Sequence, residues 1–368
     1  MEFKRILVRA TNWVGDAVMS VPALQAVRER YPQAHIAILA RPWVAGLYGH
    51  EPFCDELIPY NAPRGWRGLR QKWHLANELR RRDFDCALLF PNAFEAAALA
   101  WLARIPVRIG YSRDGRGMLL THSVVLPQMD ETPRHQRFYY LELLKRAAII
   151  PNYAVSGAIR LSGAQAAAEC GRRRLAEASI SGPVIGVSPG AAYGGAKRWL
   201  PERFAEAAAK VAQERGATVA IFGSREELPI CAAVQEMLEA RGRRCMNFGG
   251  ATSLAEFIEL AAACEVFLTN DSGPMHIASS MGVPTVAVFG ATDDTATGPT
   301  GETSRVIREP VECSPCLLRE CPIDHRCMTL VSAERVAQAA LSLIETDGKL
   351  KGGHAQKNCE LGPGVRFT

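Results

Sequence analysis

The strongest constraint on the fold is an alternation of short, β-branched apolar runs with longer amphipathic stretches, which the chain passes through twice. Strands separated by helical stretches in this way predict parallel sheets with helices on both faces. The expected strands of the first pass are 5–8, 37–39, 86–90 and 107–110, and those of the second pass are 184–187, 218–223, 266–269 and 285–290. Each run ends at a turn residue before a helix, which is typical of βα units.

The repeated pattern also predicts the domain organisation. A length of 368 residues exceeds a usual single core, and the region 155–182 between the two passes is the natural linker. We expect an α/β protein with two Rossmann-like domains facing a central cleft, because ligands of such sheets bind outside the carboxyl ends of the strands. The expected domains are 1–170 and 171–346, with a helix over 332–346, followed by a flexible Gly- and Lys-rich tail, 347–368.

Composition and charge exclude several classes of protein. No apolar run approaches the roughly 20 residues that span a bilayer, and residues 1–10 form a strand pattern rather than a signal peptide, so we expect a cytoplasmic protein. A net charge of +5 is too small to indicate a nucleic-acid partner. The eleven cysteines are expected to be mostly reduced in that compartment.

One basic segment stands apart from the rest of the chain. Residues 64–82 contain seven Lys or Arg but a single acid, Glu78, together with Trp66 and Trp73. The segment is either an ordinary solvated helix face or an interfacial helix that faces anionic lipid or sugar phosphates.

An aspartate follows the first expected strand. Asp16 lies in the segment Asn12-Trp13-Val14-Gly15-Asp16, at the start of a helix. Such a residue is often an N-cap that accepts backbone N–H bonds. A carboxylate at the mouth of a cleft can also act as a general base on an acceptor hydroxyl, and the two roles are compatible.

Two segments of the second pass are suited to phosphate. The Gly-rich loop 188–199 carries Lys197, and small residues let backbone N–H groups approach an anion; the loop lacks the Gly-Lys-Ser/Thr ending of an NTP-hydrolysing P-loop. The segment 269–278 opens a helix, where Asp271 and Ser272 could cap the helix or its N–H groups could hold a pyrophosphate. A further Gly-rich piece, 289–294, should face the same cleft.

A cluster of cysteines near the C-terminus leaves two interpretations open. Within 313–327 the soft ligands are Cys313, Cys316, Cys321, His325 and Cys327. They could hold structural zinc or an iron–sulfur cluster, but their spacing fits no standard template well, so we favour free or occasionally disulfide-bonded thiols and expect no metal in the active site.

Taken together, these segments resemble the ADP-heptose:lipopolysaccharide heptosyltransferases, most closely the heptosyltransferase II type. The resemblance spans roughly residues 4–345. Its motifs are Trp13-Val14-Gly15-Asp16, Leu89-Phe90-Pro91-Asn92, Pro189-Gly190-Ala191 with Ala196-Lys197-Arg198-Trp199, and Asn270-Asp271-Ser272-Gly273 with His276. Four segments in one order are far more specific than any one of them.

The resemblance implies a GT-B fold with an acceptor-binding N-terminal domain and a donor-binding C-terminal domain, and an inverting transfer that needs no metal or other cofactor. Asp16 matches the base and Lys197 matches the lysine on the donor phosphates. Glu226 or Glu227 matches an acid near the nucleoside, with Glu227 favoured. The implied donor-binding residues are Ala192, Tyr193, Lys197, Glu227, Asp271, Ser272, Gly273 and His276, and the acceptor-binding candidates are Asn92, Arg113 and Arg116.

The expected function is therefore transfer of heptose from ADP-heptose to the heptosylated Kdo-lipid A core of lipopolysaccharide, by an enzyme peripheral to the cytoplasmic face of the inner membrane. The resemblance also favours the interfacial interpretation of 64–82. A related transferase that uses another nucleotide sugar, or that adds the first heptose, is the near alternative. A metal- or redox-sensing nucleotide-binding protein that uses the Cys313–Cys327 cluster is the alternative from another class.

Overall fold

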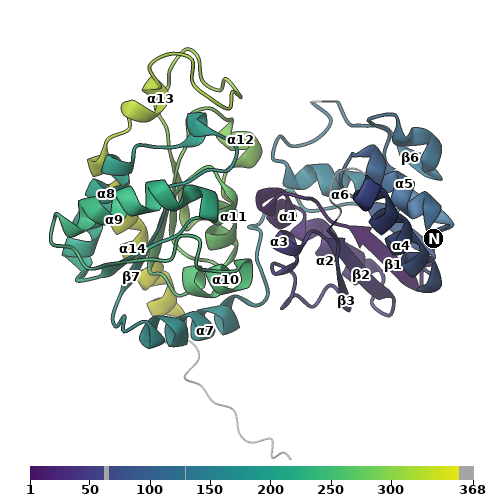
Figure 1. Ribbon diagram of the computed structural model, residues 1–368, viewed down its shortest axis with the longest axis horizontal. Helices are drawn as coiled ribbons and strands as arrows, with labels where there is room; N and C mark the ends of the chain where they lie inside the picture. Colours follow the sequence, from purple (N-terminus) through teal and green to yellow (C-terminus); the bar gives the residue numbers. More distant parts are fainter. Residues whose placement is uncertain (62–65, 129, 356–368) are drawn as a thin grey trace, which may run out of the picture.

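The computed structural model describes residues 1–61, 66–128 and 130–355, which form two lobes lying side by side (Figure 1). Each lobe contains one six-stranded sheet in which every pair of neighbouring strands is parallel. The predicted α/β class and the two Rossmann-like domains are thereby confirmed.

The first sheet has the order β3-β2-β1-β4-β5-β6. Its central strands are buried along almost their whole length, which explains their continuous apolar sequence. The strands are β1 (Arg5–Arg9), β2 (His35–Ala40), β3 (Glu56–Pro59), β4 (Cys86–Leu89), β5 (Val107–Tyr111) and β6 (His122–Val124). The helices of this domain are α1 (Val14–Met19), α2 (Val21–Arg30), α3 (Pro42–Ala45), α4 (Trp66–Arg81), α5 (Phe94–Leu102), η1 (Arg116–Leu119) and α6 (Arg137–Arg146).

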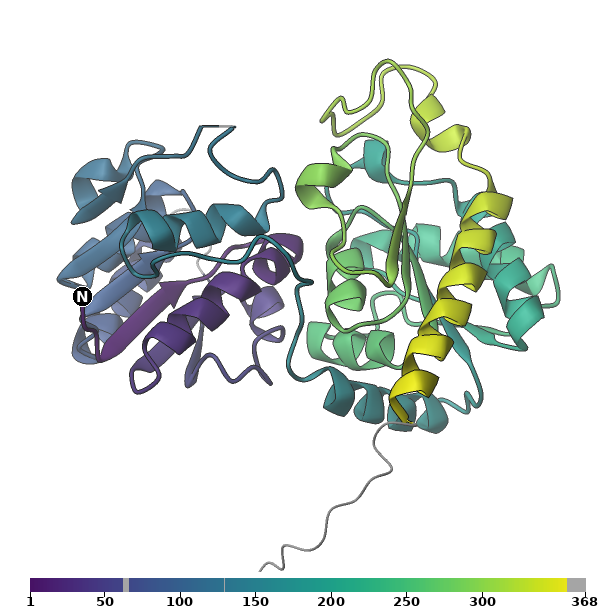
Figure 2. The same ribbon diagram turned by 180° about the vertical axis from the view of Figure 1, so that it is seen from behind.

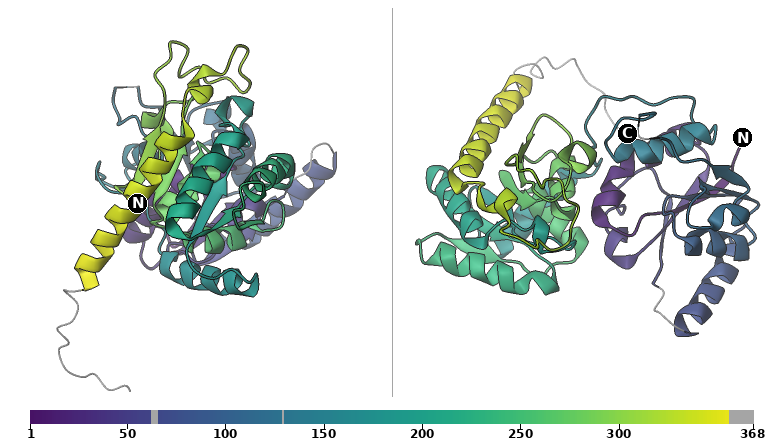
Figure 3. Two further views of the ribbon diagram at one scale, coloured as in Figure 1. Left: turned by 90° about the vertical axis from the view of Figure 1, so that its left-hand side faces the viewer. Right: turned by 90° about the horizontal axis from the view of Figure 1, so that it is seen from above.

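The second sheet has the order β12-β11-β10-β7-β8-β9. Its strands are β7 (Val184–Ser188), β8 (Thr218–Ile221), β9 (Cys245–Asn247), β10 (Val266–Asn270), β11 (Thr285–Val288) and β12 (Ser304–Ile307). Its helices are α7 (Ala164–Glu177), η2 (Gly195–Lys197), α8 (Pro201–Arg215), η3 (Arg225–Glu227), α9 (Leu228–Glu239), α10 (Leu254–Ala262), α11 (Gly273–Ser280), α12 (Asp294–Thr297), α13 (Arg326–Thr329) and α14 (Ala333–Ala355). The long α14 runs across the outer side of this domain (Figures 2 and 3).

The two sheets share one topology. Numbered from its own first strand, the second sheet has the same strand order as the first. In each sheet the direction of winding reverses next to the first strand, between β1 and β4 and between β7 and β10. Ligands of open α/β sheets bind at the carboxyl ends of the strands at this reversal. The loops after β1, β4, β7 and β10 are therefore the places where function is expected.

The domain boundary in the structure differs from the one expected at residue 170. A division at residue 170 would cut α7 in two, yet α7 packs along its length against α10 of the second domain. Gly171 permits this approach, because a Cβ atom there would lie 1.9 Å from the backbone oxygen of Glu259. The division therefore falls before Ala164, in the segment that follows α6.

The predicted tail is also shorter than expected. Residues 347–355 are helical rather than frayed, because α14 continues as far as Ala355. Residues 356–368 lie outside the described residues.

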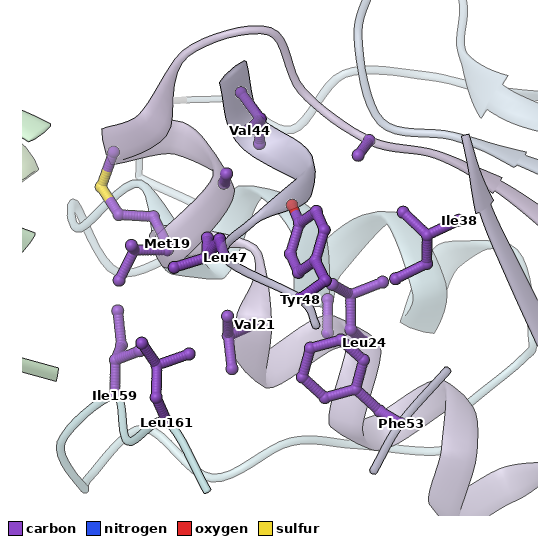
Figure 4. Close-up of a cluster of buried hydrophobic side chains, with 14 of the residues drawn as sticks. Met19, Val21, Leu24, Ile38, Val44, Leu47, Tyr48, Phe53, Ile159 and Leu161 are labelled. Carbon is purple, nitrogen blue, oxygen red and sulfur yellow. The ribbon is translucent and has the colours of Figure 1, made fainter. Parts of the chain in front are cut away.

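The segment between α6 and α7 ties the domains together. It runs from one lobe to the other (Figure 2), and Figure 4 shows Ile159 and Leu161 beside Met19 and Val21 of the first domain. The backbone N–H of Leu161 also donates to the oxygen of Ser280 in the second domain (3.0 Å). A continuous apolar core thus crosses the junction and holds the two domains in contact.

Candidate active site at the domain junction

Asp16 is the third residue of α1, the short helix that follows β1. The N-cap position belongs to Trp13, so the structure contradicts the N-cap interpretation of Asp16. The carboxylate is half-buried, and burial raises its pKa above the ordinary aspartate value, an effect that the charge of Lys197 opposes. Lys197 belongs to the second domain, so the charges of the two predicted catalytic residues influence each other across the junction.

The start of α1 lies directly against α11 of the second domain. A Cβ atom on Gly15 would lie 2.9 Å from Cδ2 of His276, and one on Gly273 would lie 3.1 Å from Cβ of Val14. Both glycines are therefore required by close approach of the two helices. His276 is buried in this contact, and burial lowers its pKa from 6.5 to about 4, although Asp271 opposes the shift. The imidazole is consequently neutral at neutral pH.

Lys197 is held at the end of the loop that follows β7. Its Nζ atom lies 2.5 Å from Oδ2 of Asp271, which is 4 % exposed, and the same oxygen accepts a hydrogen bond from Oγ1 of Thr292 (2.5 Å). The loops after β7, β10 and β11 thus meet at one carboxylate. Asp271 fixes the ammonium group instead of facing solvent as a free ligand.

Asn270 fastens the Gly-rich loop to the end of β10. Its Nδ2 donates to the backbone oxygens of Pro189 (2.8 Å) and Gly190 (3.2 Å), and its Oδ1 accepts from the backbone N–H of Trp199 (2.9 Å). Asn270 is fully buried, so these bonds hold the loop that carries Lys197 in one conformation.

The other predicted donor residues surround this centre. Tyr193 is 37 % exposed, and Nζ of Lys197 lies 4.9 Å from its ring centroid, while the neighbouring Ala192 is exposed. Ser272 is the N-cap residue of α11, and its hydroxyl lies 3.2 Å from Oγ1 of Thr269. Gly273 begins the helix that meets Asp16's helix. The structure therefore places Tyr193 beside Lys197, and Ser272 and Gly273 at the start of the helix that contacts α1.

The two adjacent glutamates after β8, Glu226 and Glu227, have different environments in the structure. Glu227 is half-buried, accepts a hydrogen bond from the backbone N–H of Ser224 (2.8 Å), and lies so close to Gly190 that a Cβ atom there would be 2.2 Å from its carboxylate. Glu226 is exposed. Glu227 is the glutamate that faces the Gly-rich loop.

The three acceptor candidates, Asn92, Arg113 and Arg116, differ in their exposure to solvent. Arg116 is completely buried and donates to the backbone oxygens of Tyr111 (2.8 Å) and Pro91, and burial lowers its pKa to about 10. The structure therefore contradicts a direct acceptor contact by Arg116, which instead braces the loop of Asn92 (3.3 Å). Asn92 also bonds the Tyr139 hydroxyl (2.7 Å), whereas Arg113 is exposed.

Sequence reasoning assigned no site role to two exposed tryptophans near the end of β1, although Trp13 belongs to the motif that contains Asp16. Trp13 is 60 % and Trp43 is 53 % exposed, and Nε1 of Trp43 donates to the backbone oxygen of Asn12 (2.9 Å). The Arg41 guanidinium lies 5.7 Å from the Trp43 ring centroid. Both tryptophans follow a strand, β1 or β2, at the carboxyl edge of the first sheet, and this position in the sequence could have indicated a site role.

The cysteine cluster lies against the loops after β7 and β11, because Ala196, Gly290 and Ala291 line the same cavity. Cys313, Cys316, Cys321 and Cys327 line a cavity of about 20 Å³ together with His325, and all are free thiols. Burial raises the pKa of Cys327 to about 11, and the three neighbouring cysteines add to the shift. Within residues 1–61, 66–128 and 130–355, no group of three or more His, Cys, Asp or Glu has the arrangement of a metal site.

Two Rossmann-like domains with a carboxylate of one opposite a lysine-bearing Gly-rich loop of the other form a ligand site between domains, and similarity to known proteins identifies it as that of a two-domain glycosyltransferase. The chain belongs to glycosyltransferase family 9 (heptosyltransferase), whose model matches residues 72–326. It is 33% identical over 311 residues to lipopolysaccharide heptosyltransferase 2 of Salmonella typhimurium, covering 83% of this chain and 88% of that protein.

Solved structures agree. E. coli ADP-heptose lipopolysaccharide heptosyltransferase II superposes with a TM-score of 0.78 at 28% identity, covering 94% of this chain and 99% of that one. A family 9 glycosyltransferase of Veillonella parvula, at 22% identity, gives a TM-score of 0.80 over 94% and 98% of the two chains and shows the same fold. The expected GT-B fold and family are thus confirmed.

The neutral His276 predicts a pH dependence of stability. Because its folded pKa of about 4 lies below the ordinary 6.5, the unfolded chain binds more protons in that window, and the stability is fully present above pH 6.5 and lost as the pH falls toward 4. Between pH 7 and pH 5 the unaltered chain should lose about 2 kcal/mol more free energy of unfolding than His276→Gln, measured by urea denaturation. Equal losses would show that the folded protein does not lower the pKa of His276.

Proposed function

We propose that this protein transfers heptose from ADP-heptose to the heptosylated Kdo-lipid A core of lipopolysaccharide, with inversion at the anomeric carbon. The observation that carries the proposal is the placement of Asp16 of the first domain opposite Lys197 of the second, where Lys197 opposes the burial-induced rise in the pKa of Asp16. The similarity to proteins named lipopolysaccharide heptosyltransferase 2 supports the sugar and the acceptor.

The reaction follows from these positions. Asp16 removes the proton of an acceptor hydroxyl as that oxygen attacks the anomeric carbon, and the bond from this carbon to the diphosphate oxygen breaks with its electron pair leaving on ADP. A single displacement inverts the configuration. Burial keeps Asp16 a better proton acceptor than an exposed carboxylate, because its pKa is raised.

The second domain stabilises the leaving group. Lys197 neutralises charge that develops on the diphosphate, and the N-terminus of α11 offers backbone N–H groups at Ser272 and Gly273. Asp271 acts by positioning Lys197, with which it is paired at 2.5 Å. Glu227 packs against Gly190 and lies at the end of the site that receives the nucleoside. No metal or cofactor is assigned a role in this scheme.

The first domain receives the acceptor. Arg113 is exposed and can bind acceptor phosphate or carboxylate, while Asn92 is held by Tyr139 and Arg116 at the end of β4. Trp13 precedes α1 and Trp43 lies in α3, and both are exposed, which suits contact with sugar rings.

The proposal is tested by release of the nucleoside diphosphate, which is ADP from an ADP-sugar and UDP from a UDP-sugar. The chain is incubated with ADP-heptose and heptosylated Kdo-lipid A, and in parallel with ADP-glucose or UDP-glucose as donor and with Kdo-lipid A lacking heptose as acceptor. We expect ADP release that depends on both ADP-heptose and the heptosylated acceptor. Release without acceptor would indicate hydrolysis, and preference for another donor or for the unheptosylated acceptor would replace the assigned substrates.

We further propose that the enzyme acts in the cytoplasm, on the inner surface of the inner membrane, through α4. In the described part of the chain, no helix is long and apolar enough to cross a bilayer. On α4, Leu69 (58 % exposed), Trp73 (57 %) and the exposed Arg80 lie on one side, given the helical spacing. An exposed apolar and cationic stripe suits an anionic interface. Arg64 lies outside the described residues.

Charge removal on α4 should weaken membrane binding. Arg80 and Arg81 are exposed, whereas the adjacent Arg82 is paired with Glu78 and is left unaltered. The double variant Arg80→Gln/Arg81→Gln should bind vesicles containing anionic phosphatidylglycerol roughly 10- to 30-fold more weakly, because each surface charge contributes about 1 kcal/mol.

Co-sedimentation measures the effect. The matched control is Arg172→Gln/Arg173→Gln, which removes two exposed charges from α7 of the second domain. Equal losses in both double variants, or none in either, would remove α4 from the membrane contact.

A further inference from the structure

The loop that contains the cysteine cluster packs onto the donor loop. It links β12 to α13, and four of its groups bond the loop after β7, one of them Nε2 of His325, which lies 3.1 Å from the oxygen of Ala196. The backbone N–H of Ala196 donates to the oxygen of Arg319 (2.9 Å), that of Gly195 donates to Oε1 of Glu320 (2.9 Å), and the Tyr193 hydroxyl donates to the oxygen of Leu317 (2.8 Å). The two loops therefore form one unit.

The close approach depends on a glycine of the donor loop. Gly194 has φ +156°, and a Cβ atom there would lie 2.2 Å from the backbone oxygen of Arg319. The cysteine-rich loop is also tied to the loop after β11, because the backbone N–H of Leu317 donates to the oxygen of Ala291 (2.8 Å). Arg319 is consequently held at the edge of the donor site by its own backbone.

The side chain of Arg319 lies against the same ring as Lys197. Its guanidinium carbon is 5.3 Å from the Tyr193 ring centroid, and Nζ of Lys197 is 4.9 Å from that centroid. The two cations differ in one respect. Lys197 is paired with Asp271 at 2.5 Å, whereas Arg319 is exposed and forms no ion pair with any residue that the structure describes. Arg319 is therefore an uncompensated positive charge beside the Gly-rich loop, as is Arg198 within the loop, whose guanidinium bonds the backbone oxygen of Ala191.

We propose that Arg319 binds the diphosphate of the nucleoside diphosphate donor alongside Lys197. This inference rests on the proposed donor site at Lys197. A guanidinium can bond two phosphate oxygens through a planar pair of N–H groups, whereas an ammonium acts as a point charge. The cysteine-rich loop is thus a part of the donor site that supplies a phosphate ligand.

Calorimetric titration with ADP tests the role without depending on catalysis. Arg319→Gln should weaken ADP binding roughly tenfold, Arg319→Lys should lie between Gln and the unaltered chain, and adenosine binding should not change, because only phosphate contacts are lost. The backbone bond to Ala196 survives each substitution, so the melting temperature without ligand should stay the same. Arg241→Gln is the matched control, since this exposed arginine lies at the far end of α9.

The outcomes separate the two proposals. An unaltered chain that binds ADP with the same affinity as Arg319→Gln overturns the role of Arg319 and leaves the donor site in place. Equal weakening of adenosine and ADP binding would also overturn it, because the effect would then not be on phosphate. An unaltered chain that does not bind ADP at all overturns the donor site and Arg319's role together.

Discussion

Replacing Asp16 by Asn is expected to lower turnover by roughly a thousandfold, because a positioned general base contributes on the order of 10²–10⁴ in rate. Asparagine has the shape of aspartate but cannot accept the proton of the attacking hydroxyl. ADP affinity should stay within about twofold, since the diphosphate is bound by the other domain. The measurement is steady-state ADP release with the heptosylated acceptor, together with calorimetric titration of ADP.

Two results bear directly on this prediction. Asn92→Ala is the matched control, because it removes a polar group of the same domain that does not take a proton in the proposed reaction, and it should affect the acceptor KM more than turnover. Turnover of Asp16→Asn within about tenfold of the unaltered chain would reject the base role.

Lys197→Gln is expected to reduce kcat/KM for the donor by roughly 10²–10³, the loss that follows removal of one group that stabilises developing charge. The substitution has a second consequence. Asp271 is 4 % exposed and paired with Lys197 at 2.5 Å, so the single variant leaves a buried carboxylate without its cation and should also be less stable.

The double variant Lys197→Gln/Asp271→Asn separates the two effects. It removes both charges, so its melting temperature should recover toward that of the unaltered chain while its kcat/KM stays low. Recovery of activity along with stability would mean that Lys197 acts only by supporting the fold.

The pH profile links the two residues. The rate needs ionised Asp16, so kcat/KM should rise with pH through a midpoint above the ordinary aspartate value of 3.8. Lys197 lowers the pKa of Asp16, so its removal should move this midpoint to higher pH in Lys197→Gln. A midpoint that stays in place would indicate that the two groups do not interact.

The fold was predictable where burial made the pattern strong. All eight expected strands are present, and the four that were not expected, β3, β6, β9 and β12, are the edge strands of the two sheets. Edge strands are short and half-solvated, so their sequences lack the continuous apolar runs of central strands. The boundary at residue 170 failed because an amphipathic helix does not indicate which domain it packs against.

The site was predictable at the level of loops but not of contacts. Asp16, Lys197 and Asp271 follow strands at the winding reversals, where topology alone directs attention. Burial could not be inferred for Arg116, because a loop arginine is ordinarily exposed and only the packed structure shows its backbone partners. The ion pair of Lys197 with Asp271 joins residues far apart in sequence, which no local pattern reveals.

A crystal structure with bound ADP-heptose, or with an analogue that cannot be transferred, tests the central claim most directly. We predict that the diphosphate lies within hydrogen-bonding distance of Lys197 and of the backbone N–H groups at the start of α11, and that the anomeric carbon faces Asp16. A sugar nucleotide bound away from the contact between α1 and α11, or with its anomeric carbon turned from Asp16, would contradict the account.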